Sequence, residues 1–147
     1  MERVNDAFLL VGRLLMASLF LAVGIPHALQ GYGGGFAKYL ASLGMPYPEI
    51  MAVVGTAIEI LGGIALVLGV LPRISALLLI AFLIVAAGLA HRYWEFPDAQ
   101  QQMNQMNHFL KVIALVGGML FYYVSGPGAW SLAGRSTGAG AAHPARA

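Results

Sequence analysis

Residues 50–71 read IMAVVGTAIEILGGIALVLGVL, an apolar run whose one charged side chain is Glu59. An α-helix rises about 1.5 Å per residue, so about 20 apolar residues cross the roughly 30 Å hydrocarbon core of a bilayer. The stretch therefore predicts a membrane-spanning helix that carries a carboxyl group near its middle.

Three further apolar runs of similar character lie at 7–29, 74–90 and 109–125. Arg13 interrupts the first run, and Lys111 stands near the start of the last. Because short loops join neighbouring helices in opposite directions, we expect an all-α polytopic membrane protein built as an antiparallel bundle of four transmembrane helices.

The composition agrees with a bilayer as the solvent. Hydrophobic residues make up 59% of the 147 residues and charged residues only 10%, against about 25% in ordinary soluble domains. The net charge is +2 and the cations are not clustered, which argues against nucleic-acid binding. The chain has no cysteine, so disulfides, thiolate metal sites and cysteine nucleophiles are excluded.

The segments between the runs predict one membrane domain over residues 1–132. The tight break at 69–73 contains Gly and Pro and predicts a helical hairpin, and residues 36–40 can form a short interfacial helix. Residues 133–147 are small, polar and rich in Gly and Ala, and we expect them to be disordered.

Two features of the N-terminus argue that its apolar run is retained and is not a cleaved signal peptide. Glu2 and Asp6 stand where a signal peptide carries basic residues, and Pro26 and His27 make a poor cleavage site.

The Lys and Arg residues of the loops predict how the chain is oriented in the inner membrane of a bacterium. With four spans, both termini and the 71–73 hairpin share one side, and cations favour the cytoplasm. The side with the termini carries four cations, Arg3, Arg73, Arg135 and Arg146. The opposite side carries two, Lys38 and Arg92. Both termini are therefore predicted to be cytoplasmic.

Arg13 and Glu59 are the charged residues expected inside the membrane, where ionisable groups are costly and usually pair. Their helices run in opposite directions, and their Cα atoms would differ by on the order of 9 Å along the bundle axis. An Arg13–Glu59 ion pair would be either a structural clamp or a device that frees one partner for an anion, a quinone carbonyl or a proton.

Glycines recur on the second and fourth runs at helical spacing. Small residues let helices, or a flat ligand, approach the backbone closely. We expect helix packing at Gly55, Gly62, Gly63, Gly117 and Gly118.

Three histidines are expected on the side of the membrane opposite the termini. His27 ends the first helix, His91 ends the third and His108 begins the fourth, with Lys111 one turn further on. They can be interfacial residues that end their helices, or they can line a polar pocket. The absence of an acidic cluster or a close histidine pair disfavours a metal or haem.

The order and spacing of several short motifs resemble those of the DoxX family of small four-helix bacterial membrane proteins. The resemblance covers about residues 8–132. The matching motifs are Gly12-Arg13-Leu14-Leu15, Gly24-x-x-His27, Phe36-Ala37-x-Tyr39-Leu40-x-x-Leu43-Gly44-x-Pro46, Glu59-x-x-Gly62-Gly63-x-x-Leu66-x-x-Gly69, Arg73, His91, Asn107-x-x-x-Lys111 and Gly126-Pro127-Gly128-x-x-Ser131-Leu132.

The resemblance implies a link to redox physiology, through a subunit of thiosulfate:quinone oxidoreductase and membrane complexes that defend against oxidants. It matches the polar residues Arg13, Glu59 and His91. Family members often carry lysine where this chain has His27, which puts a fixed positive charge at that position in doubt. Without cysteine, any sulfur chemistry would need a substrate thiol, a cofactor or a partner subunit.

Three functions remain open from the sequence. The first is a redox-associated subunit with a pocket for a quinone or small anion, in which Arg13 anchors an oxygen, Glu59 relays a proton and His91 donates a hydrogen bond. The second is a non-catalytic packing or assembly subunit, working with protein partners or as a homo-oligomer. The third is a small transporter or channel, although paired repeats are only faintly present.

Overall fold

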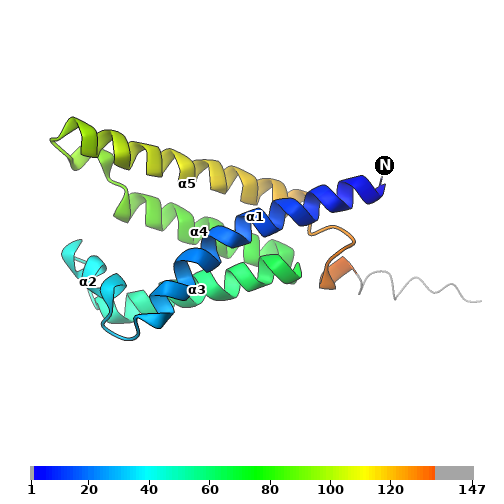
Figure 1. Ribbon diagram of the computed structural model, residues 1–147, viewed down its shortest axis with the longest axis horizontal. Helices are drawn as coiled ribbons and strands as arrows, with labels where there is room; N and C mark the ends of the chain where they lie inside the picture. The colour runs from blue at the N-terminus through cyan, green and yellow to red at the C-terminus, as the bar shows by residue number, and fades with distance from the viewer. Residues whose placement is uncertain (1, 135–147) are drawn as a thin grey trace, which may run out of the picture.

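The computed structural model describes residues 2–134 of the chain (Figure 1), so most of the predicted disordered tail, 135–147, lies outside the described residues. Most of the described part is helical, and it contains no strand. Its elements are α1 (Glu2–Leu29), α2 (Gly35–Ser42), α3 (Pro48–Leu68), α4 (Pro72–Ala90), the 3₁₀ turn η1 (Tyr93–Glu95) and α5 (Ala99–Ser125).

Four of the described helices, α1, α3, α4 and α5, are long and apolar enough to cross a membrane. They run in alternating directions (Figure 1). The all-α polytopic fold predicted from the sequence is confirmed, and the spanning helices place the chain in a lipid bilayer.

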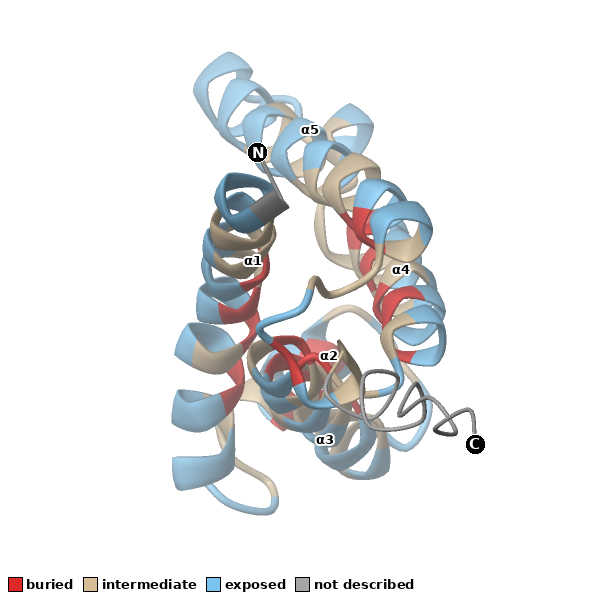
Figure 2. Cartoon of the chain, turned by 90° about the vertical axis from the view of Figure 1, so that its right-hand side faces the viewer, coloured by how far each residue is buried: buried red, intermediate tan, exposed pale blue. Residues whose placement is uncertain are grey.

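The helices pack in the order α1, α3, α4, α5, while α1 and α5 touch only briefly. Seen end-on in Figure 2, the buried residues lie on the sides of α1, α3 and α4 that face one another. The short helix α2 packs on α3 at one end of the bundle, which we call the α2 end. The opposite end, where α1 begins, α3 meets α4 and α5 finishes, is called the terminal end (Figure 1).

Helix α5 begins at Ala99 and not at residue 109, where the apolar run begins. Asp98 caps the helix, because its Oδ1 accepts a hydrogen bond of 2.8 Å from the backbone N–H of Gln101. The polar run that follows is helical as well. Hydropathy marks the part of a helix that can lie in lipid, and it does not mark where the helix starts.

The predicted hairpin between α3 and α4 is built around Gly69 and Leu71. Both residues have left-handed backbone conformations, with φ of 64° at Gly69 and 44° at Leu71. The N–H of Gly69 bonds the carbonyl of Leu66, and Pro72 opens α4, where its missing N–H costs nothing.

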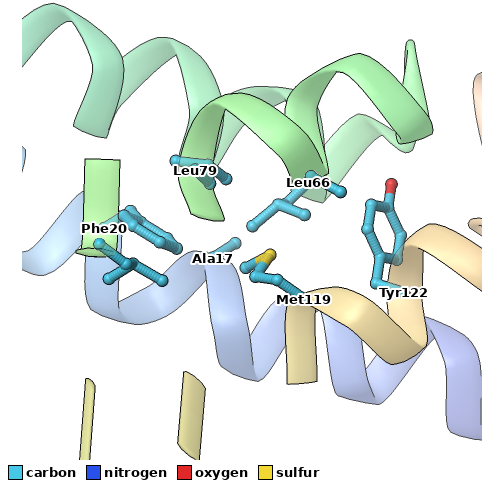
Figure 3. Packing of buried hydrophobic residues seen from close by; sticks show 8 residues of the cluster. Ala17, Phe20, Leu66, Leu79, Met119 and Tyr122 are labelled. Atoms are coloured by element: carbon cyan, nitrogen blue, oxygen red, sulfur yellow. The ribbon is translucent and has the colours of Figure 1, made fainter. Parts of the chain in front are cut away.

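A small apolar core joins all four long helices (Figure 3). Leu66 of α3, Leu79 of α4 and Met119 of α5 are completely buried, with Ala17 and Phe20 of α1 beside them. The many other apolar side chains are exposed on the bundle surface, as expected of helices that face lipid.

The glycines named from the sequence differ in how tightly they pack. A Cβ on Gly62 would lie 2.6 Å from Cδ2 of Leu79, and one on Gly63 would lie 2.8 Å from Cγ of Leu21. Gly55 lies against Phe36, and Gly118 lies against Met16.

Gly117 departs from the expected packing role. A Cβ there would meet no atom within 4 Å. Neighbouring glycines point to different sides of a helix, so only Gly118 of this pair faces another helix closely.

We expect Gly62→Val to lower the free energy of unfolding by about 1–3 kcal/mol more than Gly117→Val does, because only the first forces side-chain atoms into the buried Leu79. Thermal unfolding of the two variants in the same mild detergent measures the difference. Equal stability of the two variants would contradict the packing described here.

Candidate functional site

Glu59 is buried in α3 and pairs with His27 near the end of α1. The His27 Nδ1 and Glu59 Oε2 atoms are 3.0 Å apart, and the whole Glu59 residue is 6% exposed. The pair therefore provides a carboxyl group with a titratable partner inside the α2 end of the bundle.

The Arg13–Glu59 ion pair considered from the sequence is not formed. Arg13 and His27 are 14 residues apart on α1, which corresponds to about 21 Å along the helix. Since Glu59 bonds His27 at the α2 end, Arg13 lies too far towards the terminal end to reach it.

The absence of a side chain at Gly24 allows the His27–Glu59 pair to form. A Cβ on Gly24 would lie 2.8 Å from Cβ of Glu59 and 3.3 Å from the backbone nitrogen of Ile60. The missing side chain lets α1 and α3 approach closely where Glu59 must reach His27, one helical turn further on. Gly24 was not among the candidate site residues, although its spacing of three from His27 already put both on one face of the helix.

Phe36 of α2 fixes the His27 ring from another side. The two ring centroids are 4.1 Å apart and their planes differ by 7°, so the rings stack. The short helix thus holds the imidazole in place.

A cavity of about 750 Å³ lies beside the pair, between α1, α2, α3 and α4. Most of its lining is aliphatic or aromatic. Its polar or titratable side chains come from His27, Tyr39, Glu59 and His91. We call this space the large cavity.

A smaller cavity of about 300 Å³ also touches His27. Phe36 is shared by both cavities, while the polar side chains of Tyr32, Glu49 and Thr56 line only the smaller one. His27 is therefore part of the wall of two spaces of different polarity.

His91 and His108 form a second cluster at the α2 end. Their rings stack with centroids 5.3 Å apart, and Nδ1 of His91 lies 2.9 Å from Oε1 of Gln105. His91 lines the large cavity, whereas His108 and Lys111 are exposed on α5, which contributes nothing to its lining. Of the predicted polar candidates, the large cavity unites His27, Glu59 and His91.

Within residues 2–134, no three His, Asp or Glu side chains come close enough together to hold a metal ion.

Arg13 has a different position and a different partner. It is 2% exposed, and its Nη2 donates a hydrogen bond to the backbone carbonyl of Trp130, beyond the end of α5. Asp6 adds a second link, since its Oδ1 accepts a 2.8 Å hydrogen bond from the N–H of Ala129. Helix α1 thus holds residues 126–131 across the terminal end.

Arg13 forms no ion pair with a carboxylate of the described residues, and its Nε and Nη1 have no hydrogen-bond partner there. The guanidinium lies against Gly69, at the C-terminal end of α3, where no side chain would fit. Helix C-termini carry partial negative charge, so their carbonyl groups offset part of the cost of this buried cation. The sequence could not show this, because the stabilising groups belong to the backbone.

Replacing Arg13 with Met should free residues 126–131, because the Trp130 carbonyl loses its donor, and should cost about 1–3 kcal/mol of stability. Hydrogen exchange measured by mass spectrometry should show faster exchange in this segment. Arg73→Met, which removes an exposed cation from the same end, is the matched control. Equal exchange in the two variants would refute the clamp.

The family model for DoxX matches residues 8–92 of the chain. Inner membrane protein YphA of Escherichia coli strain K12 is 33% identical over 128 residues, which span 87% of this chain and 89% of that protein. Inner membrane protein YqjF of the same organism is 31% identical over 132 residues, which span 90% of this chain and 94% of that protein. No solved structure gives a significant match.

The family match extends over the first three spanning helices, and each of the two relatives aligns with more than four fifths of the chain. With four helices able to cross a bilayer, the chain is a multi-pass inner membrane protein, and it belongs to the DoxX family.

Proposed function

We propose that the protein binds a lipid-soluble molecule of quinone size in the large cavity and acts as a redox-associated membrane subunit. One observation carries the proposal: a largely apolar cavity of about 750 Å³ has the buried His27–Glu59 pair in its wall.

The size and lining suit such a ligand. Small-molecule sites commonly measure about 300–1,000 Å³ and combine an apolar lining with a few polar groups. In its imidazolium form, in which both ring nitrogens carry hydrogen, His91 can donate a hydrogen bond from Nε2 to a carbonyl oxygen, and Tyr39 adds a hydroxyl group. When bound, a quinone would supply two carbonyl groups that together accept two electrons and two protons.

The cavity favours an uncharged ligand over the small anion also considered from the sequence. Its described lining includes no Lys or Arg, and Arg13 lies at the opposite end of the bundle. Since Glu59 is negative when ionised, an anion beside it would be repelled. We therefore assign the anchoring of a ligand oxygen to His91 and not to Arg13.

The redox association is supported by the family resemblance and by the presence of a buried acid–base pair in the cavity wall. In this proposal Glu59 holds or releases a proton beside the ligand and His91 donates a hydrogen bond. The chain has no cysteine, so electrons would come from a partner subunit or from another molecule.

A packing or assembly subunit is the second candidate, and Arg13 is the observation that favours it. The most deeply buried charge of the bundle ties the chain to its own residues 126–131. In that case the large cavity would have no specific occupant.

For the orientation, we propose that the α2 end faces the outer side of the membrane. Arg3 and Arg73 lie on elements at the terminal end, and Lys38 and Arg92 lie at the α2 end. With a cytoplasmic C-terminus, we expect a C-terminal fusion to green fluorescent protein to fluoresce and a C-terminal fusion to alkaline phosphatase to be inactive. The reverse pattern would refute it.

The cavity itself can be tested with Ala86→Phe, which places a ring in the large cavity. A short-chain ubiquinone analogue should bind the wild-type protein stoichiometrically, and the variant should bind at least about tenfold more weakly. Titration of the purified protein in mild detergent, with mass spectrometry of its organic extract, measures both.

The matched control is Ala114→Phe, an exposed position on α5 outside the cavity, which should leave affinity unchanged. Glu59→Gln should also weaken binding, whereas Arg13→Met should not. An extract that holds only bulk phospholipid, together with equal titrations of both phenylalanine variants, would favour the assembly subunit.

A further inference from the structure

His27 lines both cavities at the α2 end, and residues of the exposed loop after α1 line only the smaller one. The smaller cavity is lined by residues of the loop after α1, including Gly31 and Tyr32, and Tyr32 is 76% exposed. The large cavity, where Glu59 lies, is surrounded mainly by aliphatic and aromatic side chains. The smaller cavity therefore offers water a more polar surface than the large cavity does.

The carboxyl group of Glu59 lines the large cavity and not the smaller one, whereas His27 lines both. The His27 side chain is 21% exposed and that of Glu59 only 8%. A proton that reaches Glu59 from the smaller cavity thus meets the imidazole first.

Imidazole is suited to this position because its two ring nitrogens can take up and give off protons near neutral pH. Nδ1 of His27 is 3.0 Å from Oε2 of Glu59, within the distance for direct transfer. Phe36 stacks on the ring and keeps it in this orientation. The other ring nitrogen, Nε2, is left for exchange with water.

We propose that His27 carries protons between water in the smaller cavity and Glu59 in the large cavity. This deepens the proposed function, since it rests on that function for the ligand that would use the proton.

The transfer is balanced without any oxidant. Nε2 of His27 takes a proton from a hydronium ion or buffer acid in the smaller cavity. The Nδ1–H bond breaks, its electron pair stays on nitrogen, and an O–H bond forms at Oε2 of Glu59. The ring is then neutral and carries its proton on Nε2. When the transfer runs in reverse, Nδ1 takes the proton back from Oε2 of Glu59 and Nε2 releases its proton to water, which restores the first state of the ring.

Several other groups face the pair and set its electrostatic surroundings. Tyr32 and Glu49 line the smaller cavity together with His27, and Tyr39 and His91 line the large cavity together with Glu59. Among the residues that the structure describes, His91 is the one other imidazole that lines either cavity, so it is the competing route.

The test uses the complete protein in mild detergent without any ligand. A pH jump is followed by time-resolved infrared spectroscopy of the Glu59 carboxyl band, which Glu59→Gln identifies by its loss. We expect His27→Ala to slow protonation of Glu59 by about 100-fold, the range of a single general acid–base group. Added imidazole should restore the rate, and His108→Ala, which removes an exposed imidazole outside both cavities, should leave it unchanged.

A second variant leaves the pair intact. Ala52 lines only the smaller cavity, so Ala52→Phe should exclude water there and also slow the protonation. A wild-type rate in both His27→Ala and Ala52→Phe would overturn the proposal. So would equal slowing by His91→Ala, or a Glu59 band that does not respond between about pH 4 and pH 10.

The outcomes separate this proposal from the proposed function. Failure of the ubiquinone analogue to bind, with normal His27-dependent protonation, refutes the ligand and leaves the proton route intact. Normal binding with protonation that does not depend on His27 refutes the proton route alone.

Discussion

The close approach of α1 and α3 at Gly24 is the contact on which the α2 end of the bundle depends. Without a Cβ at Gly24, the backbone of α3 comes near enough for Glu59 to reach His27. A buried carboxylate without a partner would be costly in a bilayer, so the pair and the close approach require one another. Phe36 then stacks on His27 and ties α2 to the same point.

The bundle places its two buried charged residues, Arg13 and Glu59, in different surroundings. Glu59 lies beside a cavity and has a partner that can change its charge. Arg13 always remains charged, lies beside the ends of helices and bonds a backbone carbonyl. The first arrangement suits chemistry, and the second suits the maintenance of a fold.

The sequence was sufficient for the helices and insufficient for their contacts. The apolar runs predicted the four spans because the bilayer imposes both length and composition. They could not predict that α5 starts at Ala99, since a polar helix outside lipid has no hydropathy signal. The pairing of Glu59 was missed for another reason: Arg13 was the stronger cation, but axial position decides which groups meet. Gly117 shows the same limit, because its neighbour Gly118 is the same type of residue but lies on a different face of the helix.

The bonds from Arg13 and Asp6 to residues 129 and 130 connect α1 with a segment that is synthesised after all four spanning helices. Helices α1 and α5 otherwise touch only briefly. During synthesis, α1, α3 and α4 can associate while Arg13 still lacks its acceptor. The Arg13 bond across the terminal end can form only when Trp130 has been synthesised, so a chain truncated before this residue leaves Nη2 of Arg13 without its acceptor.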